Sequence, residues 1–153
     1  MRAVLDASAA IEIVVERSQA ARLGGILEEA DLVLAPDLFV PEVVNVMWKY
    51  HQFEQWGLAV CDRALESALS MVDILVPSKE LYGEAFLLAR TTRRPAYDMF
   101  YIALARREDA TLSPPARNCE KRRSARVYVW LELGPRAAAS PTSARFTPRH
   151  HRP

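Results

Sequence analysis

Three acidic residues that are far apart in the sequence stand at places where a carboxylate can do chemistry. Asp6 follows the short, mostly apolar run 2–5, which is typical of a buried central strand. Glu42 falls in the first turn of a helix predicted after the second strand. Asp98 opens the helix that precedes the fourth predicted strand. Ligands of a parallel α/β sheet bind outside the carboxyl ends of its strands. We therefore expect the three carboxylates to converge in one cleft at that edge.

Three carboxylates in one cleft cannot all stay ionised without a counter-charge. A hard divalent cation supplies it, because Mg²⁺ binds one or two carboxylates, keeps several waters and leaves room for a substrate phosphate. The chemistry that this predicts is metal-assisted attack of water on a phosphodiester. Ser8, two residues after Asp6, has two interpretations. Its hydroxyl orients the Asp6 carboxylate by a hydrogen bond, or it is a simple helix-start residue.

The elements that must position these acids can be read from the alternation of short apolar runs with helical patterns. Strands that alternate with helices of this length imply a parallel central sheet with helices on both faces, which is a three-layer α/β/α fold. Ser78 stands in the N-cap place of the fifth helix. The patterns predict strands over 2–5, 31–35, 73–77 and from 110, and helices over 8–16, 18–29, 38–53, 58–71, 78–91 and 98–107.

Each of the three acids stands in a segment with a recognisable pattern. The segments are Val4-Leu5-Asp6-Ala7-Ser8-Ala9, Pro36-x-x-Phe39-x-x-Glu42-Val43-x-Asn45 and Tyr97-Asp98-Met99-x-Tyr101-x-Ala103-Leu104-Ala105. They resemble the leading motifs of the PIN domain, in order and at typical intervals over residues 2 to 112. The resemblance extends to the VapC-type ribonuclease toxins of toxin–antitoxin pairs. It implies a homodimeric endoribonuclease that uses Mg²⁺ or Mn²⁺, is inhibited by a small antitoxin protein, and binds the metal through Asp6, Glu42 and Asp98.

The resemblance ends after the fourth predicted strand. The family usually has a Thr-x-Asp-like segment there, whereas Leu112 is followed by Ser113-Pro114-Pro115 and no acid occurs before Glu120. From residue 113 onward the chain has nine Lys and Arg, two acidic residues and six of its ten prolines, which marks a different kind of sequence. We therefore divide the chain into a PIN-like core over 1–112, a degenerate end of the domain over 113–133 and a disordered basic tail over 134–153.

A reading-frame shift near Ser113, in the gene or in its sequencing, is the explanation that we infer for this break. A one-base shift across residues 112–130 permits, within codon degeneracy, a helix and a strand of the kind that the family has there. The missing fourth acid favours an alternative function, a catalytically impaired PIN-like protein that retains only dimer and antitoxin binding. A third alternative, an aspartyl-nucleophile phosphatase, needs a second acid where Ser8 stands.

Two further groups of residues each have two interpretations. Arg90, Arg93 and Arg94 precede the Asp98 helix and either bind RNA phosphates near the metal or form a solvated basic turn. The aromatic residues in and just after the third helix either stack on nucleic-acid bases or belong to the core or a dimer interface. These are Trp48, Tyr50, His51, Phe53 and Trp56.

Length and composition indicate the broad class of the protein. The chain has 153 residues, half of them hydrophobic and a quarter charged, which is the composition of one globular domain. No run of 18 apolar residues occurs, and Asp6 interrupts the N-terminal segment before the apolar core of a signal peptide. We therefore expect a cytoplasmic protein that does not span a membrane.

Overall fold

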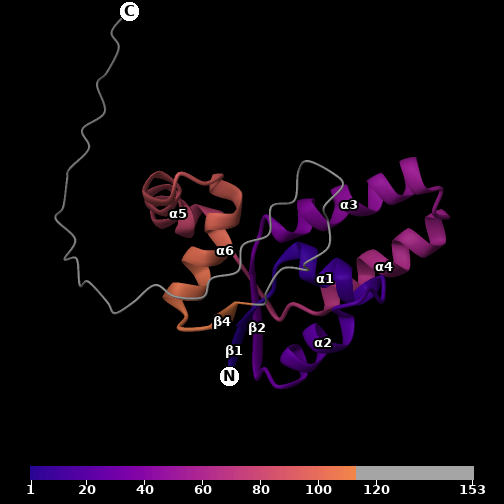
Figure 1. Ribbon diagram of the computed structural model, residues 1–153, viewed down its shortest axis with the longest axis horizontal. Helices are drawn as coiled ribbons and strands as arrows, with labels where there is room; N and C mark the ends of the chain where they lie inside the picture. Colours follow the sequence, from indigo (N-terminus) through magenta and orange to yellow (C-terminus); the bar gives the residue numbers. More distant parts are fainter. Residues whose placement is uncertain (113–153) are drawn as a thin grey trace, which may run out of the picture.

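The computed structural model describes residues 1–112, which form a parallel β-sheet with helices on both faces (Figure 1). Within these residues the sheet has four strands in the order β3-β2-β1-β4, and every neighbouring pair is parallel. The predicted three-layer α/β/α fold is thereby confirmed. The elements are β1 (Arg2–Val4), α1 (Ala7–Val14), α2 (Ala20–Glu28), β2 (Leu32–Pro36), α3 (Phe39–Glu54), α4 (Leu58–Ser70), β3 (Ile74–Val76), α5 (Ser78–Thr92), α6 (Ala96–Arg107) and β4 (Thr111–Leu112).

The helices form two groups that cover the two faces of the sheet. Helices α1 to α4 pack against one another, whereas α5 pairs with α6. Helix α6 in turn contacts β1, β2 and β4, so it is the member of its pair that lies on the sheet. Figure 1 shows the two groups on opposite sides of the strands. No helix within residues 1–112 has the length and hydropathy that crossing a bilayer requires.

The hydrophobic core follows from the apolar runs and stripes of these elements. Burying one Leu or Phe side chain stabilises the fold by about 1.5–3 kcal/mol, so the fully buried side chains dominate its stability. A small second cluster lies between α5 and α6 and consists of Ala85, Met99 and Ala103. The largest fully buried side chains are Phe39, Leu5, Leu23, Met47, Leu81, Met99, Leu104, Val4 and Val43.

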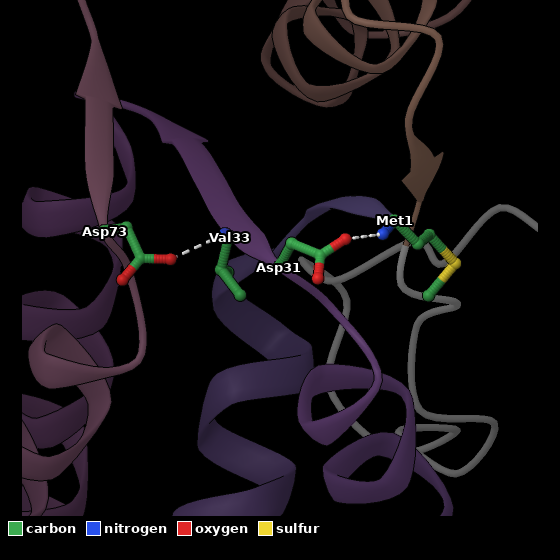
Figure 2. A network of polar contacts seen from close by, with 4 residues as sticks. All are labelled: Met1, Asp31, Val33 and Asp73. Atoms are coloured by element: carbon green, nitrogen blue, oxygen red, sulfur yellow. Dashed lines mark hydrogen bonds and ion pairs between the residues drawn. The ribbon is translucent and has the colours of Figure 1, made fainter.

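Polar contacts fix the amino edge of the sheet (Figure 2). The Asp73 carboxylate accepts a hydrogen bond from the Val33 N–H at 2.7 Å, and the Asp73 N–H donates to the Val33 carbonyl at 2.9 Å. This exchange extends the β2–β3 ladder by one residue. The Met1 ammonium pairs with the Asp31 carboxylate, and the Asp31 N–H donates to the Met1 carbonyl at 2.8 Å. These contacts continue the β1–β2 and β2–β3 pairings at the edge opposite to the predicted site.

The prediction that Ser78 caps the fifth helix is wrong. Pro77 holds the N-cap place of α5, and Ser78 is its first helical residue. The Asp37 carboxylate accepts hydrogen bonds from the Ser78 N–H, at 3.0 Å, and from the Ser78 hydroxyl. A residue that follows β2 thus supplies the cap, which a local pattern cannot show. The predicted segments 113–133 and 134–153 lie outside the described residues.

The aromatic residues of α3 and the turn after it divide between core and surface. Tyr50 is 7% exposed, and Trp56 packs on it with the ring centroids 4.8 Å apart. Trp48 and Phe53 are 53% and 59% exposed and meet edge to face, with their centroids 5.7 Å apart. His51 is exposed, and its Nδ1 lies 2.7 Å from the Trp56 carbonyl oxygen. Core packing therefore accounts for Tyr50 and Trp56 alone.

Candidate active site

Asp6 lies in the connection between the central strand β1 and helix α1. Its extended backbone makes it the N-cap of α1, and its Oδ1 accepts a hydrogen bond from the Ser8 N–H at 2.8 Å. The Ser8 hydroxyl donates to the same oxygen. Of the two interpretations of Ser8, the structure favours the first: Asp6 starts the helix as its N-cap, and the Ser8 hydroxyl orients the Asp6 carboxylate. Asp6 keeps some accessible surface, yet burial raises its pKa more than the bonds from Ser8 lower it.

Glu42 lies in the first turn of α3, as predicted. Its Oε2 accepts a hydrogen bond from the Tyr101 hydroxyl at 2.6 Å, which joins α3 to α6. Burial raises the pKa of Glu42 to about 7; the Tyr101 bond acts in the opposite direction, and the charges of Asp6 and Asp98 raise it further. A carboxyl with this pKa exchanges its proton near neutrality.

Asp98 lies in the first turn of α6. Burial raises its pKa to about 6, the negative charge of Asp6 adds to this, and the positive charge of Arg94 opposes it. The charge of Asp6 acts on both Glu42 and Asp98, and the charge of Asp98 acts on Glu42. The three carboxylates therefore lie within electrostatic reach of one another.

Each of the three acids is anchored by the residue beside it in the sequence. Leu5 precedes Asp6, Val43 follows Glu42, and Met99 follows Asp98; each of these three apolar side chains is 0% exposed. An apolar residue buried against the core fixes the backbone of its neighbour. The acids therefore project from rigid elements, which is the arrangement that a precise site requires.

Whether this site fits a divalent cation can be judged from its donor set. Within residues 1–112 no three His, Cys, Asp or Glu side chains are placed as a ready-made set of direct metal ligands. The negative charges of the set nevertheless raise the pKa values of Glu42 and Asp98, and a cation would relieve that repulsion. Mg²⁺ needs only one or two direct carboxylates and binds the rest through its waters. The donor set fits Mg²⁺ or Mn²⁺ held in this way.

The three arginines near the end of α5 are not equivalent. Arg94 lies close enough to Asp98 for its charge to lower the pKa of that carboxyl. Arg93 is the C-cap of α5, with a left-handed φ of 56°, and it is exposed. The Arg90 guanidinium lies 5.7 Å from the centroid of the Phe86 ring on the same helix. Arg94 is thus the member of this group that the structure connects to the acids.

Tyr101 is a site residue for which the sequence pattern predicted no separate role. It is 3% exposed and lies three residues after Asp98, so both side chains occupy one face of α6. Burial and the nearby carboxylates raise the pKa of Tyr101, so its phenol stays protonated and donates to Glu42. The spacing from Asp98 was visible in the sequence. Its hydrogen-bond partner Glu42 lies on another helix, so the sequence could not show that contact.

Comparison with known proteins and families complements this geometry. Among curated proteins, the comparison found no match. Among families, the model of the PIN domain matches residues 3–112, which contain the whole described sheet apart from the first residue of β1, and all three acids. The chain therefore belongs to the PIN domain family, whose members are typically metal-dependent nucleases.

Proposed function

We propose that this protein is a metal-dependent endoribonuclease, the toxin of a type II toxin–antitoxin pair that acts in the cytoplasm. The observation that carries the proposal is the electrostatic coupling of Asp6, Glu42 and Asp98 at the carboxyl edge of the sheet. PIN domain nucleases bind RNA, which supports RNA as the substrate. The similarity of the three motifs to VapC-type toxins supports the toxin role.

The residues of the site take distinct parts in this proposal. Asp6, Glu42 and Asp98 would hold Mg²⁺ or Mn²⁺, directly or through its waters. When bound, such a cation activates water for attack on a phosphodiester and stabilises the leaving oxygen. Ser8 fixes the Asp6 carboxylate by two hydrogen bonds. Arg94, which lies near Asp98, and its neighbour Arg93 offer positive charge to the RNA phosphates.

Exposed apolar side chains support the proposed homodimer and the proposed antitoxin partner. Large apolar groups that are about half exposed or more mark surfaces that bind proteins when they gather on one face. Helices α3 and α4 carry one set, and α5 with the start of α6 carries another. The sets are Val44, Trp48, Phe53, Leu58 and Val60, and Tyr82, Phe86, Leu87 and Tyr97.

A second candidate function is a catalytically impaired PIN-domain protein that only binds its own copy and an antitoxin. The observation that favours it is in the sequence after β4, where residues 113–119 contain no acid. A site with three acids instead of four would hold its cation more loosely. The two candidates differ in whether the purified protein cleaves RNA.

The proposed activity is tested by incubating the purified full chain with single-stranded RNA in Mg²⁺ or Mn²⁺. We expect cleavage that stops when the metal is chelated and that is lost in Asp98→Asn, because an amide keeps the shape of the side chain and removes the charge that the cation needs. Asp62→Asn is the matched control, since Asp62 is an exposed residue of α4. It should cleave as the parent does.

Three results decide between the candidates. Cleavage by Asp98→Asn at the parent rate would remove this site from the nuclease proposal. A parent protein without cleavage in either metal, but with a homodimer in light scattering, would favour the impaired protein. Cleavage that resists chelation would contradict metal dependence itself.

A further inference from the structure

Tyr101 is a core residue whose hydroxyl contacts the candidate site. Its ring belongs to the main hydrophobic core, and the residue is 3% exposed. Its hydroxyl donates to Glu42 Oε2 at 2.6 Å, across 59 residues of sequence. A buried phenol needs one acceptor, and a backbone carbonyl would serve it as well. Here the acceptor is one of the three acids of the site.

The position of Tyr101 also relates two of the acids to each other. Asp98 and Tyr101 are one turn apart on α6, so the backbone of one helix sets the distance between the carboxylate and the phenol. The phenol in turn holds Glu42, which projects from α3. Because the ring is packed in the core, its oxygen cannot follow the carboxylate if Glu42 moves.

We propose that Tyr101 is a positioning residue that fixes the Glu42 carboxylate by holding Oε2, which leaves Oε1 for the divalent cation or one of its waters. A glutamate side chain has three rotatable bonds and loses much freedom when it is held in one place. A bond to one of its oxygens removes that freedom before the metal arrives. Residues that orient a metal ligand in this way commonly change metal affinity 10- to 100-fold when they are replaced.

This assignment rests on the proposed function, because it takes Glu42 as part of a cation site. A purely structural role makes a different prediction. If Glu42 served only as the acceptor for a buried hydroxyl, Tyr101→Phe would change the stability of the fold and leave the metal affinity unaltered. The affinity for Mn²⁺ therefore separates the two roles.

The experiment is a titration of the full-length protein with Mn²⁺, followed by the electron paramagnetic resonance of the free ion, so no activity is needed. We expect Tyr101→Phe to bind Mn²⁺ about tenfold more weakly than the parent. Tyr50→Phe is the matched control, because Tyr50 is also buried and its hydroxyl contacts Arg17. It should bind Mn²⁺ as the parent does. Circular dichroism confirms that each variant is folded.

A second comparison tests whether Tyr101 acts through Glu42. In a Glu42→Ala background both the carboxylate and the acceptor of the Tyr101 hydrogen bond are gone, so adding Tyr101→Phe should weaken Mn²⁺ binding no further. A tenfold loss that persists in that background would overturn the assignment, as would equal affinity of Tyr101→Phe and the parent. A parent that binds no Mn²⁺ would overturn the proposed function, and this assignment with it.

Discussion

Replacing Glu42 with glutamine should stabilise the metal-free protein above neutral pH and have little effect at acidic pH. Burial, opposed by the Tyr101 bond and aided by Asp6 and Asp98, raises the Glu42 pKa from 4.5 to about 7. Below pH 4.5 the carboxyl is protonated in both the folded and the unfolded chain. Between the two values the folded state binds more protons, so the free energy of unfolding falls as the pH rises. Above pH 7 the full loss is present.

The size of the effect follows from the same shift. A rise from 4.5 to about 7 in an acid's pKa corresponds to about 3 kcal/mol at high pH. Glu42 is only partly buried, so water screens part of this unfavourable electrostatic energy. We therefore expect Glu42→Gln to raise the free energy of unfolding by about 1–2 kcal/mol at high pH. The glutamine side chain of the variant is neutral and keeps an oxygen that can accept the Tyr101 hydrogen bond. The substitution therefore removes the charge without removing the contact.

Urea unfolding followed by tryptophan fluorescence, with a metal chelator present, measures this prediction at pH 8 and at pH 4. Glu66→Gln is the control, since Glu66 is an exposed residue of α4. The stabilisation should appear at pH 8 only for Glu42→Gln. A gain of equal size at both pH values, or none at pH 8, would refute the electrostatic reasoning. Saturating Mg²⁺ should stabilise the parent more than the variant.

Three further outcomes are expected. Asp37→Ala should lower the free energy of unfolding by about 1 kcal/mol in urea, because the two hydrogen bonds that Ser78 donates to Asp37 are lost from the start of α5. Leu104→Ala should lower it by about 2–5 kcal/mol, because the side chain is 0% exposed; a loss below about 1 kcal/mol would contradict its place in the core. Arg94→Gln, made in the Asp98→Asn background so that the RNA is not cut during the assay, should weaken binding of single-stranded RNA in a filter assay and reduce its dependence on salt; unchanged binding would exclude Arg94 from the RNA surface.

The fold could be predicted from the sequence because its signals are local. The runs before Asp6 and after Asp31 are apolar and short, and the segments between strands have helical spacing, so element type followed from each window by itself. The order of the strands is less local. β1 pairs with β4 through Ala3 and Thr111, a contact that only the topology of the fold sets.

The candidate site was predictable in part for the same reason. Asp6, Glu42 and Asp98 could be named as candidates because each stands at an element end, which a single sequence shows. The Tyr101 contact was missed because its partner is 59 residues away, and a tyrosine within an apolar stripe is typical of the core. The cap of α5 was assigned to Ser78 because the residue that supplies the capping oxygen, Asp37, follows a different strand.

The place of β1 in the middle of the sheet has a consequence for the protein while it is being synthesised. β1 is the first strand made, yet one of its two neighbours is β4, at the end of the described fold. At about 5–20 residues per second, Asp98 leaves the peptidyl-transferase centre on the order of five to twenty seconds after Asp6. During that interval the nascent chain holds at most two of the three acids. The ribosome therefore makes most of this chain before the chain can assemble the proposed RNA-cleaving site.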